Sequence, residues 1–199
     1  PADKIVFAGV GKADWEINLG LDNDIFCFNV ESAVELEIIN ELAAAKNKVA
    51  SIALRINPEV DAHTHAKITT GMKENKFGIN LSQLGGVLNK LKEMKNVKLI
   101  GIHSHIGSQI TDMSSFRNLV IRFNEIQEEL EAHGVTVENL NFGGGLGIDY
   151  YHPNHLSIPA FDNYFAAIHK LLQVRPGQQV HFEPGRSIVA QCGTLISKV

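Results

Sequence analysis

The sequence predicts an α/β fold built on a parallel sheet. Short apolar runs alternate with helical patterns along the chain, which is typical of parallel strands joined by right-handed helical crossovers. Several of the runs are almost continuously apolar, as strands buried on both faces should be. Six such units in 199 residues resemble the repeat of an eight-unit barrel but are too few to close one. The sheet is therefore either open and doubly wound, or part of a truncated barrel.

Composition limits the class of protein. The chain has 44% hydrophobic and 20% charged residues, as expected for a globular protein with a core. A net charge of −4 without a basic run argues against a nucleic-acid partner. There is no apolar stretch of about 18 residues, so no membrane-spanning helix is expected. The two cysteines, Cys27 and Cys192, cannot form a disulfide framework, which favours a cytoplasmic protein.

The expected strands are short runs rich in Val, Ile and Phe. They lie at residues 5–8, 25–30, 51–57, 97–105, 137–142 and 179–182. The segments between them carry apolar residues at helical spacing. Helices are expected at residues 13–19, 32–46, 81–94, 115–133 and 160–173.

Two helices have specific signals. Residues 32–46 begin with Ser32 followed by Glu35, a capping box, and the spacing predicts that one face buries three apolar side chains, Val34, Ile38 and Leu42. Residues 115–133 end before Gly134, which stands where a C-terminal cap belongs. Their expected buried stripe consists of Phe116, Leu119, Val120, Phe123, Ile126 and Leu130.

The end of the chain changes character. Residues 187–199 are predicted to form a strand with no helix before it. We therefore expect a partial barrel domain at residues 1–186 and, at residues 187–199, the first strand of a separate β domain. The chain starts with Pro1 against a strand-like run, which suggests a fragment of a longer protein.

In both candidate architectures, active sites lie at the carboxyl ends of the strands. His103 and His105 stand two residues apart near such an end. They could bind zinc, or they could be two core histidines. A third interpretation is that one histidine contacts a flat cofactor while Ser108 and nearby amides bind an anion.

Three consecutive glycines, Gly143, Gly144 and Gly145, follow the strand at 137–142. Such glycines let the backbone approach a phosphate and expose successive N–H groups to it. The pattern lacks the spacing of a dinucleotide fingerprint. A glycine-rich turn without a ligand is the alternative interpretation.

The strand at 179–182 leads into Glu183, Gly185 and Arg186. A carboxylate at the end of a buried strand needs a cation or a donor, so Glu183 either pairs with Arg186 or holds a protonated ring nitrogen. Arg186 suits a carboxylate or a phosphate. Arg55, inside an apolar run, also needs an anion or an acceptor.

Weaker signals come from loops. His63 and His65 form a second pair after Asp61, and Lys76 could bind an anion. Lys12 follows two glycines but lacks the P-loop spacing. No third and fourth zinc ligand is evident at the strand ends. The histidines, glycines, carboxylate and arginines at the strand ends therefore fit a phosphorylated aromatic cofactor better than a metal, and no metal is expected.

Several segments closely resemble the diaminopimelate decarboxylase family. They are GIHSHIGSQI, NFGGGLGIDY and EPGRSIVA, with FAGVGK, FNVES, ALRINP and the DAHTH…KENKFGI loop. This family depends on pyridoxal phosphate and has an alanine-racemase-like (β/α)8 barrel, which ornithine and arginine decarboxylases share. The resemblance implies a TIM barrel truncated to about strands 3–8, followed by the start of the C-terminal β domain.

The resemblance also implies roles for site residues. His105 would stack on the pyridine ring, and Glu183 would pair with the ring nitrogen; both are the expected catalytic residues. Arg186 would reach a substrate carboxylate or the phosphate, and Arg55 would lie under the cofactor and help position His105. The expected phosphate-binding residues are Ser108, Gly143, Gly144, Gly145, Gly185 and Arg186.

One departure from the family matters for activity. Its Schiff-base lysine lies in a Tyr-Ala-x-Lys-Ala-Asn-like segment, which this sequence does not contain. The expectation is that the whole protein, as a homodimer, decarboxylates meso-2,6-diaminopimelate to L-lysine, while this chain alone is inactive. The alternatives are an ornithine, arginine or carboxynorspermidine decarboxylase, a metal-dependent hydrolase using His103 and His105, and a non-catalytic relative.

Overall fold

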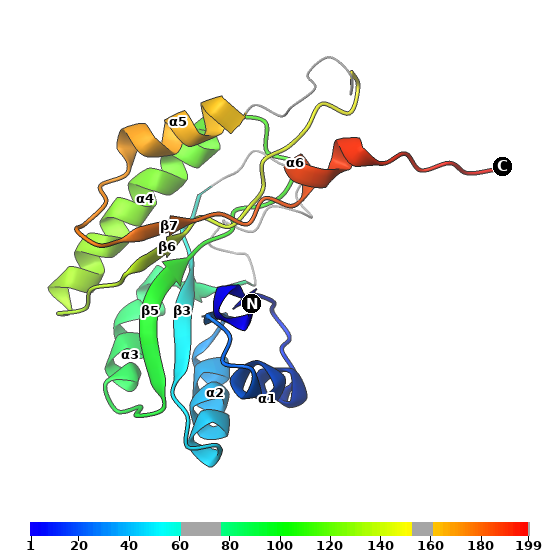
Figure 1. The fold of residues 1–199 in the computed structure, drawn as a ribbon. Helices are drawn as coiled ribbons and strands as arrows, with labels where there is room; N and C mark the ends of the chain where they lie inside the picture. Colours follow the sequence, from blue (N-terminus) through cyan, green and yellow to red (C-terminus); the bar gives the residue numbers. More distant parts are fainter. Residues whose placement is uncertain (61–76, 153–160, 199) are drawn as a thin grey trace.

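The computed structural model describes residues 1–60, 77–152 and 161–198 (Figure 1). Within these ranges the strands form one sheet in the order β1-β2-β3-β5-β6-β7, and β4 pairs with β3 beside this path. All the pairings are parallel. The predicted α/β class and parallel sheet are therefore confirmed.

Six of the strands fall where the sequence predicts them. The strands are β1 Val6–Phe7, β2 Cys27–Val30, β3 Ala50–Asn57, β4 Ile79–Asn80, β5 Val97–His103, β6 Asn139–Asn141 and β7 Gln179–His181. The exception is β4, a two-residue strand that runs directly into a helix. Its length is too short for a periodic signal.

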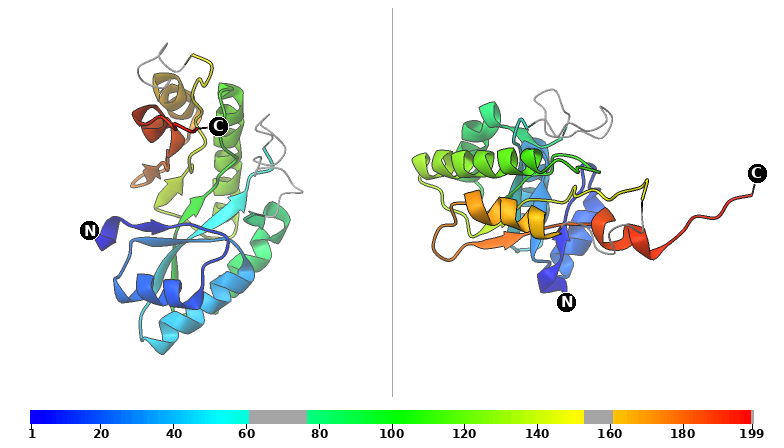
Figure 2. Two further views of the ribbon diagram at one scale, coloured as in Figure 1. Left: turned by 90° about the vertical axis from the view of Figure 1, so that its right-hand side faces the viewer. Right: turned by 90° about the horizontal axis from the view of Figure 1, so that it is seen from above.

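The five predicted helices are also present. They are α1 Asp14–Asp22, α2 Ala33–Ala45, α3 Leu81–Leu91, α4 Met113–Ala132 and α5 Phe161–Leu171. Figure 2 shows the strands curling together with these helices outside them. Helix α1 packs against α2, and α4 packs against α5. None of the helices in the described ranges is long and apolar enough to cross a membrane.

The face that α2 buries matches the prediction only in part. Ser32 caps the helix as expected, accepting a hydrogen bond from the Glu35 amide at 3.1 Å. The fully buried side chains, however, are Leu36, Ile39 and Ala43. Of the predicted three, Ile38 and Leu42 are partly buried against the core, whereas Val34 is 65% exposed. Apolar residues occur on most sides of this helix, so their spacing could not select the face that meets the sheet.

Helix α4 confirms its predicted stripe. All six predicted side chains are buried, and Gly134 adopts the left-handed conformation with a φ of +73°. The stripe packs on the sheet through Phe123, whose ring stacks on that of Phe142 at 4.0 Å between centroids. Phe116 meets the ring of Tyr164 from α5 at 4.7 Å. The main core therefore lies between the sheet and the outer helices.

The inner face of the sheet has a different character. Side chains alternate along each strand; in β3, for example, Ile52 and Leu54 belong to the main core, whereas Ala53 belongs to a small second cluster with Cys27 and Ile100. Beyond this cluster, toward the carboxyl ends of the strands, the inner positions are polar. This change from apolar to polar along the inner face defines the region of the site.

The strand predicted at residues 187–199 is wrong for the described part of that segment. Residues 186–189 form the short helix α6 (Arg186–Val189), and Ala190–Cys192 form a 3-10 turn. The amides of Ile188 and Val189 bond to the Gly185 carbonyl, so local turns satisfy a backbone that pairs with no described strand. Figure 1 shows the end of the chain extending away from the body. The proposed domain boundary stays a prediction.

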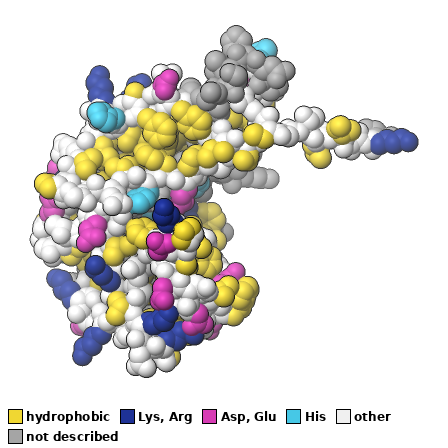
Figure 3. Space-filling model, in the orientation of Figure 1, with side chains coloured by type: hydrophobic (Ala, Val, Ile, Leu, Met, Phe, Trp, Pro, Cys, Tyr) yellow, Lys and Arg dark blue, Asp and Glu magenta, His cyan; other side chains and the backbone are white. Residues whose placement is uncertain are grey.

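Hydrophobic side chains gather on the face that carries α5 and β7 (Figure 3). Phe165 is 41% exposed there, and Val180 and Phe182 are half-buried. Strand β7 pairs only with β6 among the described strands, so this face lies at one edge of the sheet.

Candidate active site

Strand register places three polar residues in one row across the sheet. Two of them were singled out in the sequence, and the third is their neighbour. Arg55 on β3 is the register partner of His103 on β5, and His103 is the register partner of Asn141 on β6. The residues just before them, Leu54, Ile102 and Leu140, face the main core. Because side chains alternate along a strand, the polar row occupies the inner face at the carboxyl ends.

Glu183 follows β7 and joins this row. Its Oε1 atom accepts hydrogen bonds from the side-chain amides of Asn141 at 2.8 Å and Asn29 at 3.2 Å. Its Oε2 atom lies 3.4 Å from Nε2 of His103. Burial by itself raises the pKa of Glu183, but His103 and the two amides lower it to about 2. The carboxylate is therefore ionised at neutral pH.

His105 lies beyond the end of β5 and is neutral at the same pH. Burial lowers the pKa of His105 to about 4, and the charges of Arg55 and His103 act in the same direction. The Gly144 amide donates a hydrogen bond to its Nδ1 atom at 3.2 Å. An accepting Nδ1 places the ring proton on Nε2. The histidine is thus oriented by the glycine-rich segment that follows β6.

Arg55 has the acceptor that the sequence required. Its Nη1 atom lies 2.6 Å from Oε1 of Glu31, and both residues are buried. The Phe77 ring lies 5.6 Å from the guanidinium. Glu31 follows β2 and was not among the predicted site residues. The pair places a compensated charge beside His105.

A second ion pair with buried side chains, Lys12–Glu35, lies next to the Arg55–Glu31 pair along the chain after β2. Lys12 donates to the carbonyls of Gly9 and Asn29 and to Oε1 of Glu35, at 2.8, 2.7 and 2.6 Å. Glu35 also accepts from the Glu31 amide at 2.6 Å. Lys12 therefore anchors the end of β2, where Asn29 and Glu31 originate.

Arg186 and Ser108 form a separate polar group. The Arg186 guanidinium donates to Ser108 Oγ through Nη2 at 3.0 Å and Nε at 3.3 Å, and to the hydroxyl of Tyr150. Among the described residues no ion pair joins Arg186 to Glu183, so the interpretation that these two simply pair is wrong. The reason is that Glu183 is held by donors from β2 and β6, whereas Arg186 opens α6.

The three glycines have a structural reason within the protein. A side chain at Gly144 would place its Cβ 2.3 Å from the Glu183 carbonyl oxygen, and one at Gly143 would lie 2.6 Å from that of Ser104. Gly143 and Gly145 also have φ values of +63° and +106°. The glycines therefore let the ends of β5, β6 and β7 approach one another. Their role toward a phosphate stays a prediction, as does that of Gly185, where an added Cβ would meet no described atom within 4 Å.

The zinc interpretation gains no support. In the parts of the chain that the structure describes, no group of three or more His, Cys, Asp or Glu side chains could hold a metal ion. His103 faces Glu183 instead. The loop residues Asp61, His63, His65 and Lys76 lie outside the described residues.

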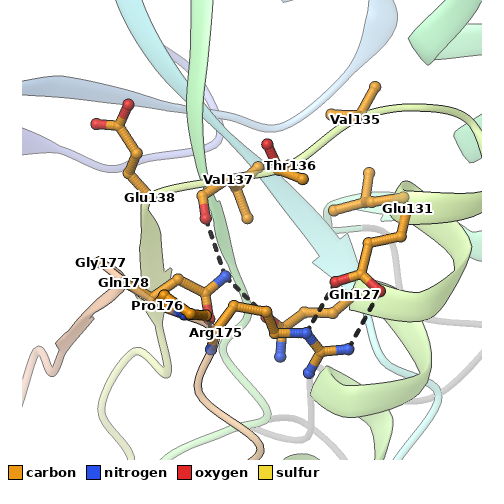
Figure 4. Close-up of a pocket in the computed structure, with 11 residues that line it drawn as sticks. Gln127, Glu131, Val135, Thr136, Val137, Glu138, Arg175, Pro176, Gly177 and Gln178 are labelled. Atoms are coloured by element: carbon orange, nitrogen blue, oxygen red, sulfur yellow. Dashed lines mark hydrogen bonds and ion pairs between the residues drawn. The ribbon is translucent and has the colours of Figure 1, made fainter.

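A pocket of about 580 Å³ lies at the opposite, amino ends of β6 and β7 (Figure 4). Its polar side chains bind one another: Arg175 pairs with Glu131 at 2.8 Å, and Gln178 donates to Gln127 at 2.8 Å. In barrel folds this end supports stability, whereas chemistry occurs at the carboxyl ends. The candidate active site is therefore the row around Glu183.

Fold and site together define an α/β-barrel type of enzyme domain, with its polar groups at the carboxyl ends of parallel strands. Comparisons with known proteins identify the enzyme family. The family described as pyridoxal-dependent decarboxylase, pyridoxal binding domain, matches residues 1–190. This chain belongs to the pyridoxal-dependent decarboxylase family.

Named relatives agree with this assignment. A diaminopimelate decarboxylase of Bacteroides thetaiotaomicron is 64% identical over 199 residues, which are 100% of this chain and 52% of that protein. One from Haemophilus influenzae is 42% identical over 200 residues, 100% of this chain and 47% of that protein. The chain thus spans about half the length of the curated relatives it matches.

Solved structures have the same fold. Diaminopimelate decarboxylase from Helicobacter pylori complexed with L-lysine gives a TM-score of 0.86 at 37% identity, covering 95% of this chain and 47% of that one. The arginine decarboxylase of Paramecium bursaria Chlorella virus bound to agmatine gives 0.72 at 25% identity, covering 91% and 45%. The expected barrel-type fold is confirmed.

Proposed function

We propose that the whole protein carrying this chain is a pyridoxal-phosphate-dependent decarboxylase that converts meso-2,6-diaminopimelate to L-lysine. The observation that carries the proposal is the ionised Glu183 beside the neutral His105, at the strand ends of a chain that is 64% identical to a diaminopimelate decarboxylase. The relative names the substrate, and the two residues have the charge states that the cofactor requires.

The residues of the site fit pyridoxal phosphate. An ionised carboxylate suits a protonated ring nitrogen, and a neutral, oriented imidazole suits the face of a flat ring. Glu183 would accept from the ring N–H, and His105 would lie against the ring with Arg55 behind it. The phosphate would be held by Ser108, Arg186 and the backbone of Gly143, Gly144, Gly145 and Gly185.

When bound, pyridoxal phosphate supplies a sink for the electrons left behind as carbon dioxide departs. Glu183 would contribute by keeping a proton on the ring nitrogen, which its low pKa favours. His105 would contact the face of the cofactor ring. Because it is neutral, it would add no positive charge to that of the protonated ring nitrogen. Arg186 is exposed and carries a fork of donors, so it suits a carboxylate of the substrate or the phosphate.

An arginine or ornithine substrate is the second candidate. The arginine decarboxylase structure is only 25% identical to this chain, against 64% for the diaminopimelate decarboxylase, which favours the first. A metal-dependent hydrolase has no comparable support.

The test uses the whole protein loaded with pyridoxal phosphate. Release of carbon dioxide is followed in parallel from meso-diaminopimelate, L-ornithine and L-arginine. We expect a strong preference for diaminopimelate, with L-lysine as the product. Preference for ornithine or arginine would overturn the substrate, and no release from any of the three would overturn the proposed activity.

We also propose that the whole protein is a cytoplasmic homodimer. Both cysteines are free, Cys27 buried and Cys192 exposed, which suits a reducing compartment. The site is open on the side of Tyr150 and Arg186, where a partner subunit could cover it. Sedimentation of the purified whole protein tests the dimer, and a monomer at assay concentration would contradict it.

A further inference from the structure

Asn141 connects two parts of the site. Its Oδ1 atom accepts a hydrogen bond from the Gly143 amide at 2.9 Å, and its Nδ2 atom donates to Oε1 of Glu183 at 2.8 Å. These two contacts agree on the orientation of the side-chain amide, because a backbone N–H only donates and a carboxylate only accepts. Asn141 is 5% exposed. One side chain thus ties the glycine-rich segment to the carboxylate.

Asn29 acts on the same oxygen from the other side of the inner face. Its Nδ2 atom donates to Oε1 of Glu183 at 3.2 Å, across 154 residues of sequence. Its Oδ1 atom is buried and has no hydrogen-bond partner in the part of the chain that the structure describes. An unsatisfied buried acceptor is costly, so stability alone does not explain an asparagine here. The contact with Glu183 does.

The two amides leave the carboxylate asymmetric. Both donate to Oε1, whereas the described residues offer Oε2 only the longer approach of His103 Nε2, at 3.4 Å. His103 is 1% exposed, and among the described residues neither of its ring nitrogens has a closer polar partner than this. Oε2 is therefore the oxygen with capacity for a further donor.

We propose that Asn141 and Asn29 are positioning residues: they hold Oε1 of Glu183 and leave Oε2 for the ring nitrogen of the bound cofactor. This inference rests on the proposed function, because it assigns that cofactor to the site. Lys12 supports the arrangement by holding the backbone carbonyl of Asn29 at 2.7 Å. Neither asparagine contacts the substrate in this scheme.

The experiment compares two serine variants of β6 in the whole protein. Asn141→Ser removes the donor to Glu183 but keeps a hydroxyl that can accept from the Gly143 amide. Asn139→Ser is the matched control, because Asn139 lies on the same strand and face but bonds to the Ile100 carbonyl and His181. Asn29→Leu removes the other donor together with its unsatisfied oxygen, so this variant should fold.

Two readouts are independent of decarboxylation. The first is the pKa of Glu183 in the cofactor-free protein, from NMR of its labelled carboxyl carbon. The second is the Kd for pyridoxal phosphate. Within the described ranges, the titratable groups coupled to Glu183 are His103, His105, His181 and Cys27, and they are the same in every variant.

We expect Asn141→Ser and Asn29→Leu to raise the pKa of Glu183 and to weaken cofactor binding about tenfold or more, as loss of a hydrogen bond to a charged group predicts. Asn139→Ser should leave both quantities near those of the unmodified protein. Unchanged pKa and Kd in folded Asn141→Ser and Asn29→Leu proteins would overturn the inference. If the whole protein does not decarboxylate diaminopimelate but the pKa and Kd change as expected, the proposed substrate is wrong and the positioning role is supported.

Discussion

At the scale of single residues, the most consequential side chain outside the predicted set is Lys12. It is 1% exposed and binds two carbonyls and Glu35, which is 13% exposed. Buried charges persist only when they are paired and hydrogen-bonded. Through these bonds Lys12 fixes the end of β2, from which the residues that hold Glu183 and Arg55 project.

Replacing this lysine should destabilise the protein strongly. Lys12→Met leaves Glu35 without its cation, and we expect a loss of about 3–5 kcal/mol in the free energy of unfolding. Urea unfolding of the whole protein measures it. Lys46→Met is the control, because the Lys46–Asp22 pair is 28% and 56% exposed and should contribute about 1 kcal/mol or less. Equal effects for both variants would contradict the buried network.

His105 makes stability depend on pH. Its pKa falls from the ordinary 6.5 to about 4 in the folded protein, chiefly through burial. Between these values the unfolded chain binds a proton that the folded chain does not, so stability decreases as the pH falls from 6.5 toward 4. The carboxylate of Glu183 adds a similar loss, but only below its ordinary pKa of 4.5.

The measurement is urea unfolding of the cofactor-free protein at a series of pH values between 7 and 5. His105→Gln should reduce the slope of unfolding free energy against pH in this range. Burial also lowers the pKa of His181, so some slope should remain. A His105→Gln protein with an undiminished slope would show that His105 is not the buried neutral group.

At the scale of elements, the close approach of strand ends determines where glycine is required. Gly144 stands against the Glu183 carbonyl, whereas Gly86, inside α3, has no atom of another described residue within 4 Å of an added Cβ. The same substitution should therefore have opposite effects at the two positions.

Gly144→Ala should destabilise the protein by about 1–3 kcal/mol, because the backbone of β6 or β7 must shift. It should also weaken binding of pyridoxal phosphate, since the shift moves Glu183. Gly86→Ala should stabilise by about 0.5–1 kcal/mol through helix propensity. Thermal unfolding and cofactor titration of both variants test this, and a neutral Gly144→Ala would contradict the packing argument.

At the scale of the whole molecule, decarboxylation depends on whether this chain contains a lysine that can bind the cofactor. The structure places Lys12 beside Asn29. All three of its short hydrogen bonds go to protein groups, so its amine is occupied. The family's Schiff-base segment does not occur in these 199 residues. We therefore expect the amine that binds the cofactor to come from a part of the whole protein outside these residues.

We accordingly expect the 199-residue chain, expressed alone, to release no carbon dioxide from diaminopimelate with added pyridoxal phosphate. The whole protein assayed in parallel is the positive control. A folded chain, checked by circular dichroism, that matched the rate of the whole protein would contradict this prediction.

The sequence by itself determined the alternation of strands and helices, because apolar periodicity depends on neighbours within one element. It also placed the polar residues at strand ends, including His105, Ser108, Glu183 and Arg186. The resemblance to a family extended these positions to a cofactor. The face of α2 and the helical turn at residues 186–189 were outside its reach, because each depends on what the segment packs against.

Only the tertiary structure decided the partners of the charged groups. Glu183 meets Asn29 and Asn141, Arg55 meets Glu31, and Arg186 meets Ser108 and Tyr150. Alternation along the strands could have signalled the inner face, since Asn29, Arg55, His103 and Asn141 each lie on it near the carboxyl end of a strand. Pairing across as many as 154 residues, however, follows from strand register and sheet curl. Those are set by how the helices pack on the sheet, which no local pattern contains.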